Sequence, residues 1–130
     1  MRGVLLLDTH LVLWFAFEPD RLSAKARKLL QSRETELAFS IATLWEVAIK
    51  SSLGRPDFSV DTKRLRHGLL AEGVAELGID AEHVARVATL PWVHRDPFDR
   101  LLVAQALSER ATLLTVDRTL AGYGRCVRVV

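Results

Sequence analysis

The chain has 130 residues, of which 49% are hydrophobic and 26% are charged, a size and composition typical of one globular domain with its own core. Its 18 basic and 16 acidic residues give a net charge of +2, which is compatible with a nucleic-acid partner but does not require one. The single cysteine, Cys126, excludes an internal disulfide and a multi-cysteine zinc site, and it fits a reducing cytoplasm.

The N-terminal segment, residues 3–17, is strongly apolar, but Asp8 and His10 interrupt it. The apolar length is too short to span a bilayer and no small-residue cleavage site follows, so we expect neither a membrane anchor nor a signal peptide. Residues 4–7 predict a strand that is buried on both faces. Residues 11–17 predict a helix that packs back on the sheet.

Apolar periodicity and turn residues predict further strands and helices along the rest of the chain. In chain order they are a helix at 24–31, a strand at 36–40, a helix at 41–50, a helix at 61–72, a strand at 74–79, a helix at 80–90, a helix that begins at residue 97, a strand at 111–116 and an edge strand at 127–130. This alternation predicts a single α/β domain over residues 1–130, with three α/β/α layers around a mainly parallel central sheet.

For two tryptophans, Trp45 and Trp92, the sequence bears on whether the side chain is buried in the core or lies at the surface. In the helix at 41–50 the apolar residues recur at helical spacing, which predicts that Trp45 packs in the core and that Glu46 and Lys50 lie on the opposite face. Trp92 lies beside a proline in a loop. For Trp92 both a structural role and a role as a stacking platform for a nucleobase stay open.

The helix that begins at Pro97 is expected to be buried. Asp96 is a good N-cap, proline is favoured at the first helical position, and Asp99 falls three residues after the cap. Residues 101–107 are almost all apolar, which is typical of a buried helix. We therefore expect the Asp99 carboxylate to be held rigidly, close to the positive end of this helix.

Four carboxylates fall at one edge of the expected sheet. Asp8 and Asp117 follow the ends of two strands, while Glu46 and Asp99 lie early in helices. Because the carboxyl ends of parallel strands and the starts of the following helices share an edge, where such folds bind ligands, we expect these side chains to converge.

Each carboxylate also has a purely structural interpretation. Asp8 and Asp117 could cap helices, Glu46 could pair with Lys50 on a helix surface, and Asp99 could be the acidic member of a capping box. Together, however, four like charges in one crevice favour protonation or a bound cation. Oxygen ligands favour Mg²⁺ or Mn²⁺, so the sequence predicts a divalent-metal site.

Four short segments stand in a characteristic order and spacing. They are Leu-Leu-Asp-Thr-His at 6–10, Ser-Ile-Ala-Thr-Leu-Trp-Glu-Val-Ala-Ile-Lys at 40–50, His-Arg-Asp-Pro-Phe-Asp-Arg-Leu-Leu at 94–102 and Leu-Thr-Val-Asp at 114–117. Together they resemble the PIN-domain ribonucleases, and within them the VapC-type toxins of bacterial toxin–antitoxin pairs. The resemblance covers essentially the whole chain.

This resemblance implies a PIN-like α/β/α fold and a metal-dependent endoribonuclease that cuts structured RNA such as tRNA or ribosomal RNA. It implies an acidic quartet at Asp8, Glu46, Asp99 and Asp117. It also implies a homodimer and a cognate VapB-type antitoxin that blocks the site.

Residues beside the quartet are candidates for supporting and RNA-binding roles. Candidates for hydrogen bonds that support the acids are Thr9, Ser40, Asp96 and Thr115. Capping of helices and strand-to-helix turns is their alternative role. Candidates for RNA phosphate contacts are Lys50, Arg95, Arg100 and Arg118. Neutralisation of nearby carboxylates is their alternative role. His10 and His94 are interpreted as loop or packing residues.

Two other function classes compete with the nuclease. One is a non-catalytic RNA- or partner-binding module with the same fold, which the complete quartet disfavours. The other is a different Mg²⁺-dependent phosphate-handling domain, such as a phosphotransfer receiver. A receiver needs a lysine at a late strand end, where this chain has Asp117.

Overall fold

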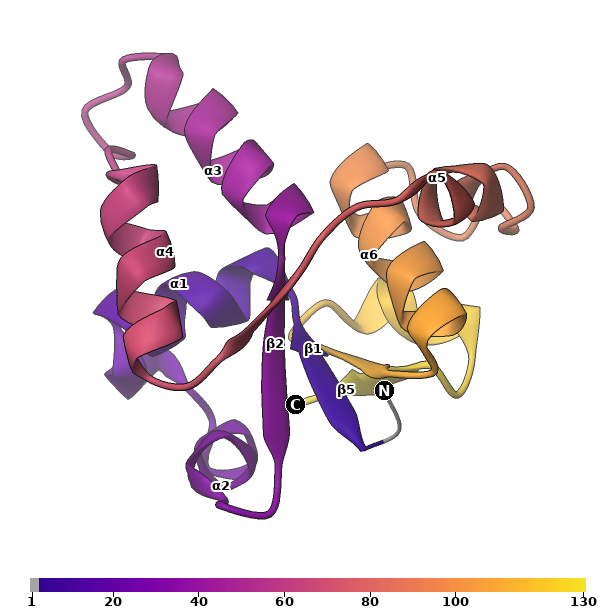
Figure 1. Cartoon of the computed structure of the whole chain (residues 1–130), viewed down its shortest axis with the longest axis horizontal. Coiled ribbons are helices and arrows are strands. Elements are labelled where there is room, and N and C mark those ends of the chain that lie inside the picture. Colours follow the sequence, from indigo (N-terminus) through magenta and orange to yellow (C-terminus); the bar gives the residue numbers. More distant parts are fainter. Residues whose placement is uncertain (1–2) are drawn as a thin grey trace.

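The computed structural model describes residues 3–130 as alternating strands and helices (Figure 1). In chain order the elements are β1 (Val4–Leu7), α1 (Thr9–Phe17), the 3₁₀ helix η1 (Pro19–Arg21), α2 (Ala24–Gln31), β2 (Glu36–Ser40), α3 (Ile41–Ser52), α4 (Thr62–Ala71), β3 (Ala75–Leu77), α5 (Ala81–Val87), α6 (Pro97–Glu109), β4 (Thr112–Thr115), the 3₁₀ helix η2 (Arg118–Tyr123) and β5 (Val127–Val129).

The five strands form one sheet in the order β3-β2-β1-β4-β5, and each of these pairings is parallel. β1 is central, and its four apolar residues are all buried, as expected for a strand covered on both faces. The chain adds β2 and β3 on one side of β1, then crosses to add β4 and β5 on the other. The switch point therefore lies between β1 and β4, which is where parallel sheets bind ligands.

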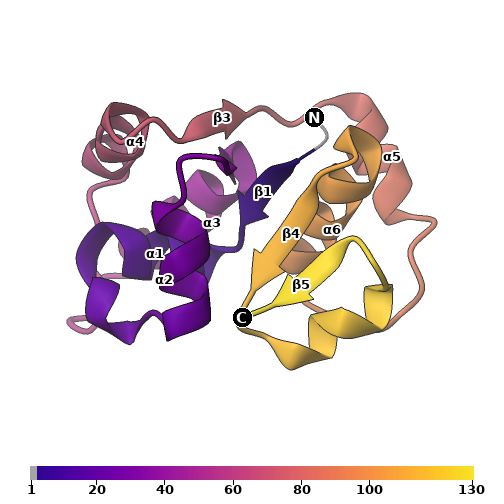
Figure 2. The ribbon, with the colours of Figure 1, turned by 90° about the horizontal axis from the view of Figure 1, so that it is seen from below.

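Helices cover both faces of the sheet, which confirms the predicted three-layer fold (Figure 2). On one face, Leu6 and Leu113 pack in a cluster that includes Leu102 of α6. On the other face, Leu7 and Leu114 pack in the cluster that holds the apolar residues of α1, α2 and α4. Full burial of each such leucine contributes about 1.5–3 kcal/mol relative to exposure.

Helix α5 is shorter than the sequence predicts, because it ends at Val87 and not near residue 90. Beyond Val87 the turn tightens, and the backbone N–H of Leu90 bonds the Val87 carbonyl at 3.3 Å. The guanidinium of Arg100 donates to that same carbonyl at 3.1 Å and contacts the Leu90 carbonyl at 3.5 Å. This side chain therefore binds carbonyl groups at the end of the helix.

The exposed face of α3 contradicts the sequence interpretation. Trp45 is 55% exposed and Leu53 57% exposed, whereas Glu46 is only 6% exposed. The prediction that Trp45 packs in the core is therefore wrong; its ring contacts the edge of Phe98, with the centroids 5.0 Å apart. Periodicity locates an apolar stripe on a helix, but it does not show whether that stripe or the polar face meets the rest of the domain.

Within residues 3–130, no helix combines the length and the apolar character needed to cross a membrane.

Candidate metal centre

Asp8 and Asp117 stand at the ends of the two neighbouring strands β1 and β4. The Asp8 carboxylate caps α1, because its Oδ1 accepts from the backbone N–H of Leu11 at 2.8 Å. The Asp117 carboxylate caps η2, because its Oδ1 accepts from the backbone N–H of Thr119 at 3.0 Å and from the Thr119 hydroxyl at 2.7 Å. Both residues therefore cap helices and leave Oδ2 turned to other partners.

Two threonines bond the buried acids. Thr115 donates its hydroxyl to Asp8 Oδ2 and accepts from the backbone N–H of Asp117 at 3.0 Å, which ties the two strand ends together. Thr9 donates to Glu46 Oε1 at 2.7 Å. Each carboxylate is thus oriented by a hydroxyl of a residue that is itself buried.

The hydroxyl of Ser40 has a different partner, so the prediction that it supports the acids is wrong. Ser40 donates to the side chain of Gln105 and accepts from the backbone N–H of Ala42 at 2.9 Å. It caps α3 and joins that helix to α6. Ser40 therefore acts on Glu46 and Asp99 only indirectly, by holding together the two helices that carry them.

We expect Thr115→Val to lower the free energy of unfolding by about 1–3 kcal/mol, because the buried Asp8 carboxylate and the partly buried Asp117 N–H both lose the Thr115 hydroxyl. Urea unfolding at neutral pH measures this loss. Thr112→Val, at the start of the same strand, is the matched control and should change stability by about 0.5 kcal/mol or less. Equal stabilities of the two variants would contradict the role of the Thr115 hydroxyl.

Asp99 is held in the first turn of α6. Its backbone N–H donates to Oδ1 of the N-cap Asp96 at 3.0 Å, and Pro97 occupies the first helical position. Burial is the main cause that raises the pKa of Asp99 to about 7; the negative charges of Asp96, Glu46 and Asp8 contribute to this rise, and His94 opposes it. The four carboxylates therefore do not all ionise readily without a counter-charge.

The other acids respond differently to their surroundings. Burial raises the pKa of Asp8 above its ordinary value, against the opposing hydrogen bonds from Thr115 and Leu11. The pKa of Asp117 is lowered, chiefly by the hydrogen bond from the Thr119 side chain. Carboxyl groups whose pKa values are pushed apart within one crevice are typical of functional sites.

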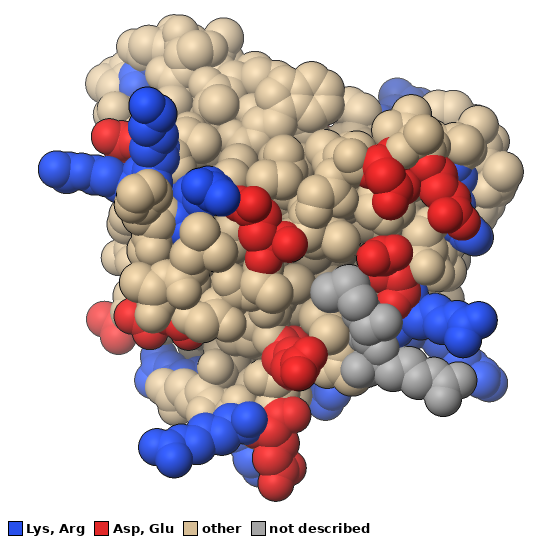
Figure 3. All heavy atoms as spheres, viewed as in Figure 1, with Lys and Arg blue, Asp and Glu red and all other residues tan. Residues whose placement is uncertain are grey.

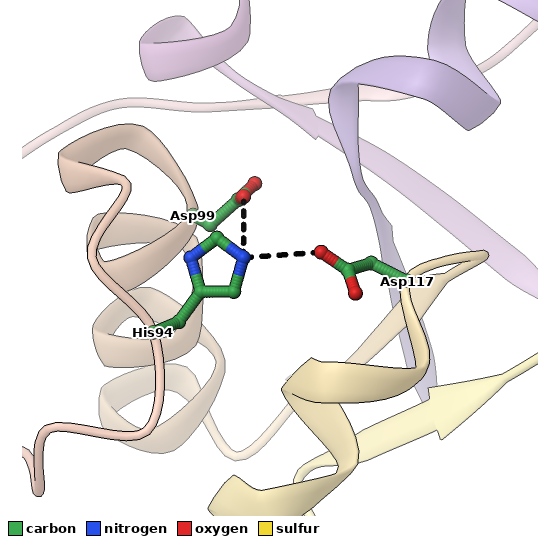
Figure 4. Close-up of side chains that lie close together, drawn as sticks. All are labelled: His94, Asp99 and Asp117. Carbon is green, nitrogen blue, oxygen red and sulfur yellow. Dashed lines mark hydrogen bonds and ion pairs between the residues drawn. The ribbon is translucent and has the colours of Figure 1, made fainter.

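His94, which the sequence analysis interprets as a loop or packing residue, lies between two of the acids (Figure 4). His94 Nε2 is 3.1 Å from Asp117 Oδ2 and 3.7 Å from Asp99 Oδ2. Its Nδ1 accepts from the backbone N–H of Asp96 at 3.1 Å, so in the neutral ring the proton is on Nε2. The sequence feature that could have indicated this role is the position of His94, two residues before the N-cap of the helix that carries Asp99.

The side chains at this edge fit a divalent cation. One ligand atom from each of His94, Asp99 and Asp117 lies within 4.8 Å of the other two. Asp8 and Glu46 are close enough for their charges to raise the pKa of Asp99. Carboxylates that repel one another when ionised are stabilised by a bound cation. Carboxylate oxygens are the ligands that hard cations such as Mg²⁺ prefer.

Comparisons with known proteins agree with this geometry. The family model of the PIN domain matches residues 5–125. The chain belongs to the PIN-domain family. Ribonuclease VapC22 of Mycobacterium tuberculosis is 32% identical to this PIN domain over 119 residues, which are 91% of this chain and 90% of that protein.

A solved structure shares the fold of this PIN domain. It is the crystal structure of VapBC2 from Rickettsia felis bound to a DNA fragment from their promoter, with a TM-score of 0.69 and 15% sequence identity. The alignment covers 98% of this chain and 97% of that chain. At this identity the likeness establishes the fold alone.

The basic residues that are near the acids in sequence differ in how far they are exposed to solvent and in whether they pair with an acid. Lys50 Nζ lies 2.6 Å from Glu46 Oε2, with half of its side chain exposed. Arg95 and Arg118 are exposed. On the face drawn in Figure 3, acidic and basic side chains stand in small separate groups over a largely uncharged surface.

Arg100 does not face solvent, so the prediction that it contacts RNA phosphates is wrong. It is 4% exposed, and its guanidinium donates at 3.0 Å to the Pro91 carbonyl and to the Tyr123 hydroxyl. With its contacts to Val87 and Leu90, it fastens the loop before α6 to that helix. A charge adjacent to Asp99 in sequence can therefore be structural.

Proposed function

We propose that this PIN domain is a metal-dependent endoribonuclease and the toxin of a toxin–antitoxin pair. The observation that carries the proposal is the convergence of Asp8, Glu46, Asp99 and Asp117 at the switch point of the sheet. Membership of the family and the name of the relative ribonuclease VapC22 support it. The expected substrates are phosphodiester bonds of tRNA or ribosomal RNA.

In this proposal the four carboxylates hold Mg²⁺ or Mn²⁺. When bound, the ion supplies a water of lowered pKa as the nucleophile and neutralises charge on the phosphate. Asp99, with its pKa of about 7, is able to release its proton in exchange for a cation near neutral pH. His94 holds Asp117 Oδ2 through its Nε2–H group, while Thr9 and Thr115 hold the other two acids.

The approach of RNA to an acidic edge needs nearby positive charge. We assign Lys50, Arg95 and Arg118 to contacts with phosphate oxygens. Lys50 pairs with Glu46, so it also offsets charge at the site itself. Phosphate contacts of this kind position the strand and carry no sequence information.

The partners follow from the same proposal. We expect a VapB-type antitoxin that blocks the site, and the structural neighbour, a VapBC2 structure, supports this expectation. We also expect a homodimer, which light scattering on the purified protein measures directly. An RNA-cutting toxin finds its substrate in the cytoplasm, where we place the protein.

Incubation of the protein with total RNA tests the function. We expect discrete fragments with Mg²⁺ or Mn²⁺ and none with a chelator. Asp8→Asn, which keeps a helix cap but removes a ligand charge, should give no fragments, whereas Asp57→Asn in an exposed loop should cut as the parent does. Intact RNA under all conditions would favour the non-catalytic binding module.

A further inference from the structure

A large aromatic side chain is exposed to solvent in the loop that leads to the acidic edge. Trp92 is 80% exposed, the highest value among the large hydrophobic side chains of residues 3–130. It lies in the loop between α5 and α6, two residues before His94, and two residues of extended chain span at most about 7 Å. The backbone of Trp92 therefore lies close to that of His94, whose ring contacts two of the acids.

The ring is held in place from one side only. The guanidinium carbon of Arg100 lies 4.0 Å from the centroid of the Trp92 ring, a cation–π contact that covers one face. The guanidinium is itself fixed by the carbonyls of Val87 and Pro91 and by the Tyr123 hydroxyl. Trp92 therefore rests on a buried cation that several hydrogen bonds hold.

The neighbouring residue fixes the same loop from another element. Val93 packs against Gly122 of η2, where an added Cβ would lie only 2.6 Å from Val93 Cγ1. The backbone N–H of His94 donates to the Tyr123 hydroxyl at 3.1 Å. The loop that presents Trp92 is thus attached to both α6 and η2, and the ring needs little further ordering on binding a partner.

We propose that an unpaired nucleobase of the RNA substrate stacks on the free face of Trp92, so that the site selects single-stranded or looped RNA. The inference rests on the proposed nuclease function. A flat, pre-oriented aromatic face suits stacking with any base, because every base has a π-face. Bases within a duplex are already stacked and paired, whereas those in loops are free to splay onto an aromatic side chain.

Binding measurements in an Asp99→Asn background, where RNA is not cut, test this proposal. The probes are a fluorescein-labelled 12-nucleotide oligoadenylate and a 12-base-pair RNA duplex, both titrated with Mg²⁺ present and followed by fluorescence anisotropy. Trp92→Leu should weaken binding of the oligoadenylate between about 5-fold and 100-fold and leave binding of the duplex unchanged. Trp92→Phe, which keeps a stacking ring, should retain most of the affinity.

A matched control replaces another exposed aromatic residue. Phe17 is 55% exposed at the far end of α1 from Asp8, about 12 Å along the helix. Phe17→Leu should bind the oligoadenylate as the parent does. Thermal melting of each variant shows whether the fold is intact.

The proposal is overturned if Trp92→Leu binds the oligoadenylate as tightly as its parent, or if it weakens single strands and duplex equally. Unchanged RNA affinity with lost self-association, measured by light scattering, would assign the ring to a protein interface. Cleavage of total RNA by the unaltered protein separates the two hypotheses. If the unaltered protein cuts RNA and Trp92→Leu binds RNA normally, the stacking role alone is refuted. If the unaltered protein neither cuts nor binds RNA, the nuclease function is refuted as well.

Discussion

Replacement of Arg100 by methionine is expected to lower the free energy of unfolding by about 1.5–3 kcal/mol, the usual contribution of hydrogen bonds made by a charged group. Methionine fills a similar length but donates no hydrogen bond. The carbonyls of Val87 and Pro91 and the Tyr123 hydroxyl would each lose the guanidinium donor. Each of the three keeps a backbone N–H donor, so the loss stays within this range. Urea unfolding measures the change.

The neighbouring arginine provides the control. Arg95 is exposed, and Arg95→Met should change stability by about 0.5 kcal/mol or less. The two variants therefore separate a structural arginine from a surface arginine five residues away. If Arg100→Met unfolds at the same urea concentration as Arg95→Met, Arg100 contributes no more than a surface charge.

Asp99→Asn is expected to abolish RNA cleavage and yet to stabilise the metal-free protein above neutral pH. The pKa of Asp99 is about 7 in the folded chain, against an ordinary value of 3.8, so the folded state binds this proton more tightly than the unfolded state. The contribution of Asp99 to the stability of the parent therefore falls as the pH rises from about 4 to about 7 and stays level above that. Asparagine does not ionise and escapes this loss.

The size of the effect follows from the exposure of the group. The Asp99 side chain is 23% exposed, so we expect a gain of about 2 kcal/mol for the variant at pH 8, and none at pH 4. Urea unfolding with a chelator present, at both pH values, measures this difference. A variant that is less stable than the parent at pH 8 would contradict the account of repelling carboxylates.

Activity and metal binding give independent readouts of the same variant. RNA cleavage should fall by at least ~100-fold, since even outer residues of metal sites contribute 10–100-fold. Millimolar Mn²⁺ should raise the melting temperature of the parent by linkage and should raise that of Asp99→Asn less. Asp57→Asn, in an exposed loop, should behave as the parent in both experiments.

Alternating apolar runs and helix caps were enough to predict the three-layer fold, because each local signal agreed with the next. β1 was the clearest case: four apolar residues in a row are consistent with a strand buried on both faces, and all four are buried. β3 and α5 came out shorter than predicted. Strand and helix ends depend on tertiary partners, such as Arg100 at the end of α5, that no local pattern contains.

Sequence could predict the positions of the site residues that are set by the topology of the sheet, but not those that are set by side-chain packing. Strand ends and helix starts share one edge, so the positions of the four acids could be inferred from order alone. The place of His94 depends on a loop whose path is set by Arg100 and Tyr123, and the burial of Arg100 depends on the same contacts. Sequence spacing alone could not distinguish these two residues from an ordinary loop histidine and a surface arginine.

The order of the strands has a consequence for the timing of synthesis. β1 is made first, but its partner on one side, β4, is made more than a hundred residues later. Until residues 112–117 have left the ribosome, a growing chain holds Asp8 and Glu46 but has neither the strand that bonds Asp8 nor Asp117. The proposed cutting centre therefore stays incomplete in a growing chain until β4 and Asp117 have emerged.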